Sequence, residues 1–226
     1  MGCALEWGSI ALGELPHVAE LCARHRVRVT GLHAHVGSGI LDAQNWSDVA
    51  LFLAEMIELF PEVRHLDVGG GLGVPEKPDQ SPLDLAALDA ALARVRQAHP
   101  QVQIWIEPGR FLVAEAGVLL ARVTQLKQKG DVRFVGVDTG MNSLIRPALY
   151  GAWHEIVNLT RLDAPLTQVA HVVGPICESG DTLGYARRLP ETQEGDVLLI
   201  ATAGAYGRAM SSSYNLRLPA EEVGLG

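Results

Sequence analysis

Lysine is scarce in this sequence. Only Lys77, Lys127 and Lys129 occur among the 18 basic residues, and all the others are arginine. The 26 acidic residues bring the formal net charge to −8, and the basic residues are not gathered into a run or a stripe. An acidic chain without a basic stripe opposes binding to a phosphate backbone, so we do not expect a nucleic-acid partner.

Cysteine is also rare, because only Cys3, Cys22 and Cys177 occur and no two of them are spaced as Cys-x-x-Cys. An odd and sparse count argues against a disulfide framework and favours a reducing compartment. No apolar run reaches the roughly 18–20 residues that cross a bilayer, and the start of the chain lacks the pattern of a signal peptide. We therefore expect a soluble, cytoplasmic protein without a membrane partner.

The first half of the chain alternates short β-branched runs with segments of helical spacing. We expect strands at 27–36, 64–68 and 102–110 and helices at 13–27, 45–60 and 82–99. This order indicates parallel strands with helices packed outside them. A complete eight-stranded βα barrel takes about 250 residues. Residues 1–112 therefore form either a small open α/β sheet or the C-terminal part of a barrel of the TIM type.

The pattern changes in residues 113–226, where strand-like runs follow one another without long helices between them. We expect strands at 117–125, 132–137, 154–159, 168–173 and 197–202, with one short helix at 147–153. Strands joined by turns indicate antiparallel pairing, so this part is expected to form a β-sandwich or Greek-key-like domain. The fold class is therefore α/β plus β, with a domain boundary near residue 112.

Two loops at predicted strand ends carry residues that suit a ligand. Residues 69–73 read GGGLG, and glycines let successive N–H groups approach a phosphate, although a tight turn without a ligand is an equal alternative. His33 and His35 alternate onto one face of the first strand. We do not expect a metal there, because no third ligand lies at a recognisable spacing, and two histidines satisfied in a packed layer remain the alternative.

Three more motifs carry reactive or charged groups. EPGR (107–110) places a carboxylate and a guanidinium at a strand end, where the active sites of βα barrels lie, although a structural ion pair explains it equally well. CESGD (177–181) places a cysteine beside carboxylates in a loop, where a buried structural cysteine is the usual alternative. GAYG (204–207) holds Tyr206 between glycines, either as part of a turn or as a ring presented to a ligand.

The order of these motifs makes the chain similar to a known family. HVGSG (35–39), GGGLG, EPGR, LIRPALYGA (144–152), CESGD and GAYG resemble the fold-type III pyridoxal-phosphate decarboxylases, and within them the diaminopimelate decarboxylases. GGG and EPGR are shared with the ornithine and arginine decarboxylases, whereas RPALY and CESGD favour the diaminopimelate branch. The match runs from about residue 27 to residue 218, and residues 1–12 do not fit it well. It implies pyridoxal phosphate as cofactor and an active site shared between the subunits of a homodimer.

The resemblance also implies a role for each cofactor-binding residue. His35 would stack on the pyridine ring, and Glu107 would pair with the pyridine nitrogen and keep it protonated. Tyr206 would contact both cofactor and substrate. The phosphate would be held by Ser38, Gly70, Gly71, Gly109 and Arg110.

The substrate roles follow from the same resemblance. The distal carboxylate of the substrate would lie at Arg110, Arg146 and Tyr150, since a guanidinium suits a planar anion. Glu178 would receive the distal ammonium group. Cys177, contributed by the partner subunit, would return a proton to the substrate carbon. The reaction implied is the decarboxylation of meso-diaminopimelate to lysine.

The chain departs from the family in its lysines. The family holds its cofactor on a lysine of an early barrel strand, upstream of the HVGSG motif, and here the three lysines lie in a loop and a polar turn. We therefore expect a C-terminal half that is inactive alone, with the lysine-bearing half supplied by another chain. Open strand edges would make it poorly stable or dimeric. The alternatives are a non-catalytic partner-binding homologue, another basic amino-acid decarboxylase, and a small phosphate-binding α/β protein.

Overall fold

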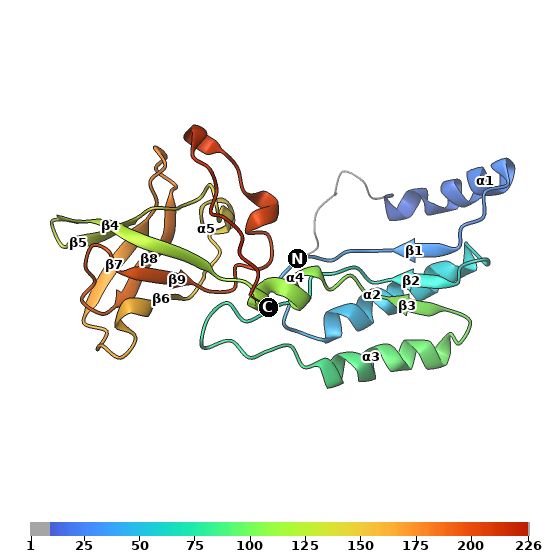
Figure 1. Cartoon of the computed structure of the whole chain (residues 1–226). Helices are drawn as coiled ribbons and strands as arrows, with labels where there is room; N and C mark the ends of the chain where they lie inside the picture. Colours follow the sequence, from blue (N-terminus) through green and yellow to red (C-terminus); the bar gives the residue numbers. More distant parts are fainter. Residues whose placement is uncertain (1–9, 226) are drawn as a thin grey trace. The chain divides into compact units, whose positions relative to one another are not determined.

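The computed structural model describes residues 10–225, and Cys3 lies outside them. The chain divides into two compact units (Figure 1). The first comprises the chain up to Pro75 together with Ser81–Phe111, and the second comprises Glu76–Gln80 together with the chain from Leu112 onward. The short segment Glu76–Gln80 therefore belongs with residues that follow it by more than 30 positions in the sequence.

The first unit contains a three-stranded parallel sheet in the order β1-β2-β3. The strands are β1 (Gly31–His33), β2 (His65–Asp67) and β3 (Gln103–Trp105), and Leu32, Leu66 and Ile104 lie side by side in register. The helices are α1 (Leu15–His25, after the 3-10 turn Leu12–Glu14), α2 (Gln44–Glu55, extended by the 3-10 turn Met56–Glu58) and α3 (Leu85–Ala98). The parallel βα arrangement expected from the sequence is confirmed.

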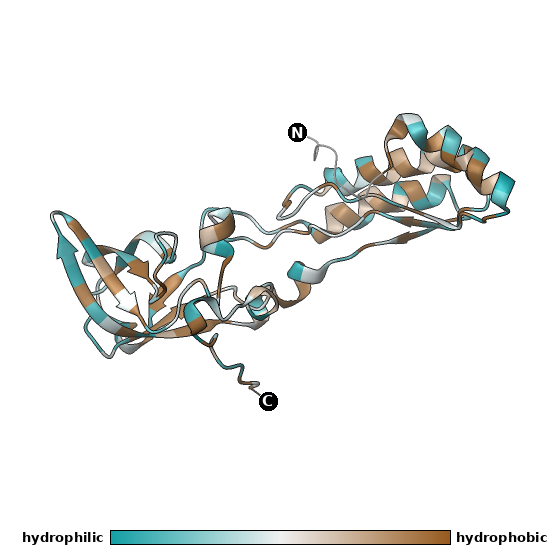
Figure 2. Cartoon of the chain, turned by 90° about the horizontal axis from the view of Figure 1, so that it is seen from above, coloured by the Kyte–Doolittle hydropathy of each residue, from teal (hydrophilic) through white to brown (hydrophobic). Residues whose placement is uncertain are grey.

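The three helices lie on one side of this sheet, as Figure 2 shows. Leu66 is fully buried, and Leu32 and Ile104 pack with it against the helical residues Trp46, Leu53 and Leu92. The opposite face carries the side chains that alternate with these, and Trp105 is half exposed there. Parallel sheets are normally covered on both faces. Within the described residues, this sheet is covered by helices on one face only.

The helix α3 begins three residues later than the sequence predicts. Pro82 was expected at the first helical position, but the helix begins at Leu85, and Asp84 is its N-cap. The Asp84 carboxylate accepts a hydrogen bond from the backbone N–H of Ala87 at 2.9 Å. An aspartate cap satisfies one of the free N–H groups of the first turn, which a proline cannot do.

The second unit contains a six-stranded sheet in the order β6-β9-β4-β5-β7-β8. The strands at the two ends of this order, β6 and β8, lie against each other, so the sheet curls into a nearly closed barrel. Its core contains Val172, Leu189, Leu198 and Ile200, all completely buried. The strands are β4 (Leu119–Lys129), β5 (Val132–Val137), β6 (Ile156–Asn158), β7 (Gln168–Val173), β8 (Thr182–Leu189) and β9 (Val197–Ile200).

Two features of this sheet differ from the expectation. The pair β5–β7 is parallel, so the sheet is mixed and not purely antiparallel. The chain between these strands contains α5 (Arg146–Tyr150), β6 and the 3-10 turn Leu159–Arg161, which is long enough for a crossover to a parallel neighbour. Strand β8 was not expected at all, although it pairs with β7 over most of its length.

Short helical turns complete the described chain: α4 (Gly109–Val113) and the 3-10 turns Ala114–Ala116, Arg208–Met210 and Tyr214–Leu216. No helix within residues 10–225 is both long enough and apolar enough to span a bilayer.

Candidate cofactor and substrate site

The loops that follow β1, β2 and β3 are joined by backbone hydrogen bonds. The N–H of Ala34 donates to the carbonyl oxygen of Asp67 at 3.0 Å, and the N–H of Glu107 donates to the carbonyl oxygen of Gly69 at 3.0 Å. The segment after β1 is also paired with the glycine loop through Ile40 and Leu72. The HVGSG, GGGLG and EPGR motifs therefore meet at the C-terminal edge of the first unit's sheet.

The glycine loop is packed too tightly for side chains. A Cβ atom on Gly70 would collide with the carbonyl oxygen of Glu107, and one on Gly71 would collide with that of Gly37. Gly71 also has a φ of +85°, in the left-handed region that other residues rarely adopt. These glycines are needed to bring the three loops together, whether or not a ligand binds beside them.

Two side chains hold Gly70 in place. The indole Nε1 of Trp46, from α2, donates to the carbonyl oxygen of Gly70 at 3.1 Å. The N–H of Gly70 donates to Nδ1 of His35 at 3.3 Å. Because Nδ1 accepts this bond, the neutral His35 ring carries its proton on Nε2. The ring itself is exposed and is available for stacking.

Glu107 lies beside a histidine and a second carboxylate. Its Oε2 is 3.4 Å from Nε2 of His33, and ligand atoms of His33, Asp67 and Glu107 all lie within 4.8 Å of one another. One oxygen of Asp67 already accepts a hydrogen bond from the N–H of Gly69 at 2.9 Å. Asp67 was missed by sequence reasoning, although its position at the end of a predicted strand, two residues before the glycine run, was a usable signal.

Arg110 and Ser38 meet across the sheet. A terminal nitrogen of the Arg110 guanidinium donates to Oγ of Ser38 at 3.0 Å, although the two residues are 72 positions apart. A Cβ atom added at Gly109 would find no heavy atom within 4 Å, so the chain is open beside this pair. A guanidinium, a hydroxyl and an open glycine backbone are the groups that bind phosphate in proteins, so these residues fit a phosphate group.

Arg146 is the first residue of α5 in the second unit, and it is buried. Its Nη1 is 3.0 Å from Nε2 of His154, and its Nη2 donates to Oε1 of Glu76 at 2.7 Å. The fully buried His154 also bonds through Nδ1 to the carbonyl oxygen of Ala201 at 2.8 Å. Burial lowers the pKa of His154, the bond to Ala201 partly opposes this, and the charge of Arg146 lowers the pKa further. The ring is therefore neutral and accepts a hydrogen bond from Arg146.

Tyr150 ends the same helix, and its side chain is mostly exposed. The helix stops there because Gly151 adopts the left-handed conformation at φ 65°. Glu76 and His154 were not among the expected site residues. They lie 70 and 8 positions from Arg146 in the sequence, and no local motif predicts either contact.

The CESGD loop is held by its last residue. Asp181 is buried, and its carboxylate accepts hydrogen bonds from the N–H groups of Met141 at 2.6 Å and Ile176 at 2.7 Å. A side chain at Gly140 or at Gly174 would collide with the Asp181 carboxylate, so glycine is required at both positions. The anchored loop presents Cys177 and Glu178, both exposed, and Cys177 is a free thiol.

A tyrosine outside the expected motifs contacts Glu178. The hydroxyl of Tyr214 donates to Oε2 of Glu178 at 3.1 Å. This hydrogen bond, together with the negative charge of Glu178, raises the pKa of Tyr214. Tyr206 lies in the same C-terminal part of the chain with a φ of +62°, and its ring is partly exposed.

The expected site residues are divided between the two units. The expected cofactor residues other than Tyr206 lie in the first unit, and the expected substrate residues other than Arg110 lie in the second.

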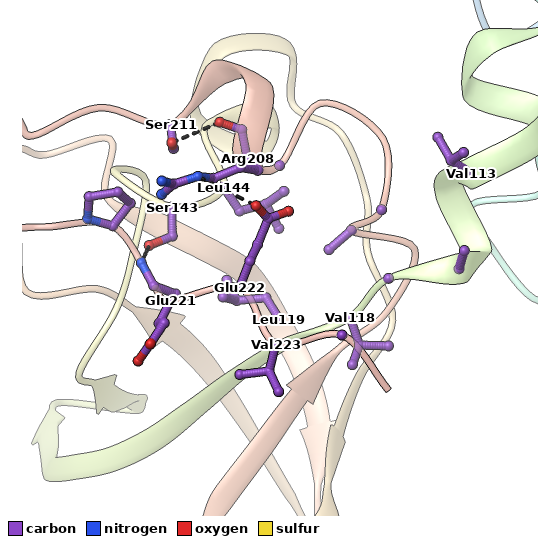
Figure 3. Close-up of a pocket in the computed structure, with 18 of the residues that line it drawn as sticks. Val113, Val118, Leu119, Ser143, Leu144, Arg208, Ser211, Glu221, Glu222 and Val223 are labelled. Carbon is purple, nitrogen blue, oxygen red and sulfur yellow. Dashed lines mark hydrogen bonds and ion pairs between the residues drawn. The ribbon is translucent and has the colours of Figure 1, made fainter. Parts of the chain in front are cut away.

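The second unit also contains a pocket of about 650 Å³ (Figure 3). Arg208 and Glu222 form an ion pair across it at 3.6 Å, and Ser143 accepts a hydrogen bond from the N–H of Ala220 at 2.8 Å. These polar groups are paired with one another. None of the described residues that line this pocket belongs to the expected cofactor or substrate set. The pocket is therefore not the candidate site.

Comparison with known proteins identifies the class to which this fold and these motifs belong. The family model described as "Pyridoxal-dependent decarboxylase, C-terminal sheet domain" matches residues 22–204, and the chain belongs to this family. The fold expected from the sequence, an α/β part followed by a β domain, is confirmed by this match.

Within this family the chain is similar to diaminopimelate decarboxylases. It is 40% identical over 204 residues to the enzyme of Aquifex aeolicus, covering 87% of this chain and 47% of that protein. It is 42% identical over 201 residues to the enzyme of Archaeoglobus fulgidus, covering 85% of this chain and 48% of that protein. The chain thus spans about half the length of the curated relatives it matches.

Solved structures agree with the sequence comparison. The crystal structure of diaminopimelate decarboxylase from Helicobacter pylori, complexed with L-lysine, superposes with a TM-score of 0.77 at 34% identity, over 90% of this chain and 52% of that one. A lysine/ornithine decarboxylase from Vibrio vulnificus gives a TM-score of 0.81 at 22% identity, over 96% and 60% of the two chains. The second likeness concerns the fold alone.

Proposed function

We propose that this chain forms the C-terminal half of a pyridoxal-phosphate-dependent diaminopimelate decarboxylase, which converts meso-diaminopimelate to lysine and carbon dioxide. The observation that carries the proposal is the meeting of Glu107, His35 and the Ser38–Arg110 pair at one edge of the sheet. The similarity to diaminopimelate decarboxylases over more than four fifths of the chain supports the choice of substrate.

The residues of the first unit would hold the cofactor. Ser38 and Arg110 bind the phosphate, while the exposed ring of His35 stacks on the pyridine. The Glu107 carboxylate would pair with the pyridine nitrogen and keep it protonated. Pyridoxal phosphate, when bound, supplies an electron sink for the electron pair left by the departing carbon dioxide.

The residues of the second unit would hold the substrate. Arg146 and Tyr150 would receive its distal carboxylate, and Glu178 would receive the distal ammonium group. The exposed thiol of Cys177 returns a proton to the carbon that has lost carbon dioxide. Tyr206 contacts both molecules. In a homodimer, Cys177 would come from the partner subunit. The two free thiols at Cys22 and Cys177 fit a reducing, cytoplasmic location.

The chain alone is not expected to decarboxylate the substrate, because its three lysines all belong to the second unit and none of them lies on β1, β2 or β3. Lys77 is exposed in the segment Glu76–Gln80, and Lys127 and Lys129 are exposed at the end of β4. A lysine from another polypeptide segment is needed to attach the cofactor covalently.

The proposal is tested by supplying that segment. The chain is produced together with the part of the Aquifex aeolicus enzyme that it does not match, and carbon dioxide release from meso-diaminopimelate is measured. We expect release from the mixture and none from either part alone. Glu107→Gln should abolish it, whereas Glu55→Gln, an exposed residue of α2, should not. An inactive mixture, combined with a chain that shows no binding of pyridoxal phosphate, would refute the proposal.

A non-catalytic, partner-binding role is the second candidate. The observation that favours it is the open face of the first unit's sheet, on which Trp105 is half exposed. Two results together would support this role over catalysis. A pull-down would recover a stable partner of the chain, and the chain would stay inactive when lysine-bearing halves are supplied.

A further inference from the structure

Arg146 already has a carboxylate partner within the chain. Its side chain is 6% exposed, and it is paired at 2.7 Å with Glu76, whose side chain is 31% exposed. Burying a cation without an anion is costly, so a carboxylate is required at this position in the absence of a ligand. His154 cannot supply the charge, because its ring is neutral and its Nε2 accepts a hydrogen bond from Arg146. Glu76 therefore neutralises Arg146.

The segment Glu76–Gln80 is a turn that holds Glu76 in place. The side-chain oxygen of Gln80 accepts hydrogen bonds from the N–H groups of Glu76 at 2.7 Å and Lys77 at 3.0 Å. The N–H of Gln80 in turn donates to the carbonyl oxygen of Lys77 at 3.1 Å. Residues 77–80 are all exposed. The turn is thus built from its own hydrogen bonds and carries one anchoring side chain, Glu76, into contact with a buried residue.

The Arg146 guanidinium has capacity that these two partners do not use. Its Nε is buried and has no hydrogen-bond partner within residues 10–225. A guanidinium binds a carboxylate best through two parallel N–H bonds. An incoming carboxylate therefore competes for the same cation as Glu76, and replacing one carboxylate by another leaves the buried charge neutralised throughout.

We propose that Glu76 is an internal competitor that occupies the carboxylate site of Arg146 and is displaced, with its turn, when a carboxylate ligand binds. Glu76 thereby sets how tightly such a ligand is held. The identification of the ligand as the distal carboxylate of an amino-acid substrate rests on the proposed function, whereas the competition itself does not.

The test uses glutarate as a probe, because it is a small dicarboxylate that needs neither cofactor nor lysine. Its dissociation constant is measured by calorimetry for the full chain and for Glu76→Gln. A tethered carboxylate competes at an effective concentration of about millimolar. We expect Glu76→Gln to bind glutarate about tenfold more tightly, and the double variant with Arg146→Gln to lose that gain. Equal affinities in the chain and in Glu76→Gln would overturn the proposal.

Two further variants keep the test decisive. Glu62→Gln breaks an exposed pair with Arg28 of similar length, 2.6 Å, and should leave glutarate binding unchanged. Gln80→Ala loosens the turn without altering the ion pair itself, and should therefore tighten glutarate binding. It replaces Glu76→Gln as the test if Glu76→Gln does not fold. Failure of Gln80→Ala to tighten binding in that case would equally overturn the proposal.

These outcomes are separate from those of the decarboxylation assay. Tighter glutarate binding in Glu76→Gln, combined with an inactive two-part mixture and no binding of pyridoxal phosphate, would leave the competition standing and refute the proposed function. An active mixture combined with unchanged glutarate affinity in Glu76→Gln would support the proposed function and overturn the competition.

Discussion

The indole nitrogen of Trp46 donates a hydrogen bond to the carbonyl oxygen of Gly70 at 3.1 Å, and the Trp46 side chain is completely buried. The bond connects helix α2 to the loop that also carries Gly69 and Gly71. The position of the glycine loop therefore depends on the packing of α2 against the sheet as well as on the loop sequence.

Replacing Trp46 by phenylalanine should weaken both the fold and the loop. The variant leaves the Gly70 carbonyl without its partner and opens a small cavity, so we expect a loss of about 2–4 kcal/mol in the free energy of unfolding. Urea denaturation of the chain measures this loss. Trp105→Phe, at a half-exposed position on the open face of the sheet, is the matched control and should cost less than about 1 kcal/mol.

Replacing Asp181 by asparagine should loosen the CESGD loop. The carboxylate accepts two backbone N–H bonds while buried, and bonds of this kind to a charged group contribute about 1.5–3 kcal/mol each. We expect destabilisation of about 2–4 kcal/mol in urea denaturation. The exposed Asp163→Asn is the control. Unfolding curves for the two variants that coincide would show that Asp181 does not anchor the loop.

The stability of the chain should fall in mild acid because of His154. Burial lowers the pKa of His154 in the folded state, so the unfolded chain takes up a proton first, near pH 6.5. The stability contributed by the neutral ring is full above that pH and is lost as the pH falls toward the folded-state pKa. Each unit by which the pKa is lowered corresponds to about 1.4 kcal/mol in the free energy of unfolding.

His154→Gln is the variant that isolates this contribution. Between pH 7 and pH 5 its free energy of unfolding should fall less than that of the unaltered chain. The comparison is made by urea denaturation at several pH values. Parallel pH profiles for the two proteins would show that His154 is not the group that titrates.

The contact between Tyr214 and Glu178 should be visible in a tyrosine titration. The neighbouring carboxylate disfavours the phenolate and raises the pKa of Tyr214. In Glu178→Gln that charge is absent, so one of the four tyrosines should ionise at lower pH than in the unaltered chain. Ultraviolet absorbance of the phenolate measures the shift. Tyr214→Phe should remove the titration that responds, and a response that persists in this variant would assign it to another tyrosine.

The strands β1 and β3 are the two edges of the first unit's sheet, and one face of that sheet is not covered by helices. Unpaired strand edges favour association with other chains. We therefore expect the isolated chain to dimerise or to unfold readily. Sizing chromatography and a thermal melt test this. A monomer with a sharp, cooperative melt would contradict the expectation.

Local patterns in the sequence were enough to predict the βα order of the first unit. The apolar runs and the glycine loops identified β1, β2 and β3, although each hydrogen-bonded strand is only three residues long because its end bends into a loop. Strand β8 was missed because Gly184, Arg187 and Arg188 interrupt its apolar pattern. The Arg187 side chain is nevertheless buried, with its guanidinium 4.2 Å from the centre of the Trp153 ring.

The motifs of the candidate site could be found from the sequence. The residues that contact these motifs from elsewhere in the chain could not. Ser38, Glu107 and Arg110 belong to local patterns that resemble a family. Glu76 and Tyr214 each make a contact across 70 and 36 positions respectively, and nothing in their immediate neighbours predicts those contacts. Such pairings depend on the tertiary structure, so sequence periodicity does not reveal them.

We propose that this chain carries a pyridoxal-phosphate site without a lysine of its own to hold the cofactor. The most direct measurement is mass spectrometry of the chain after incubation with pyridoxal phosphate and reduction with borohydride. We predict no stoichiometric labelling of Lys77, Lys127 or Lys129, and stoichiometric labelling of a lysine in the complementary half when that half is supplied. Complete labelling of any one of the three lysines in the chain alone would contradict the account.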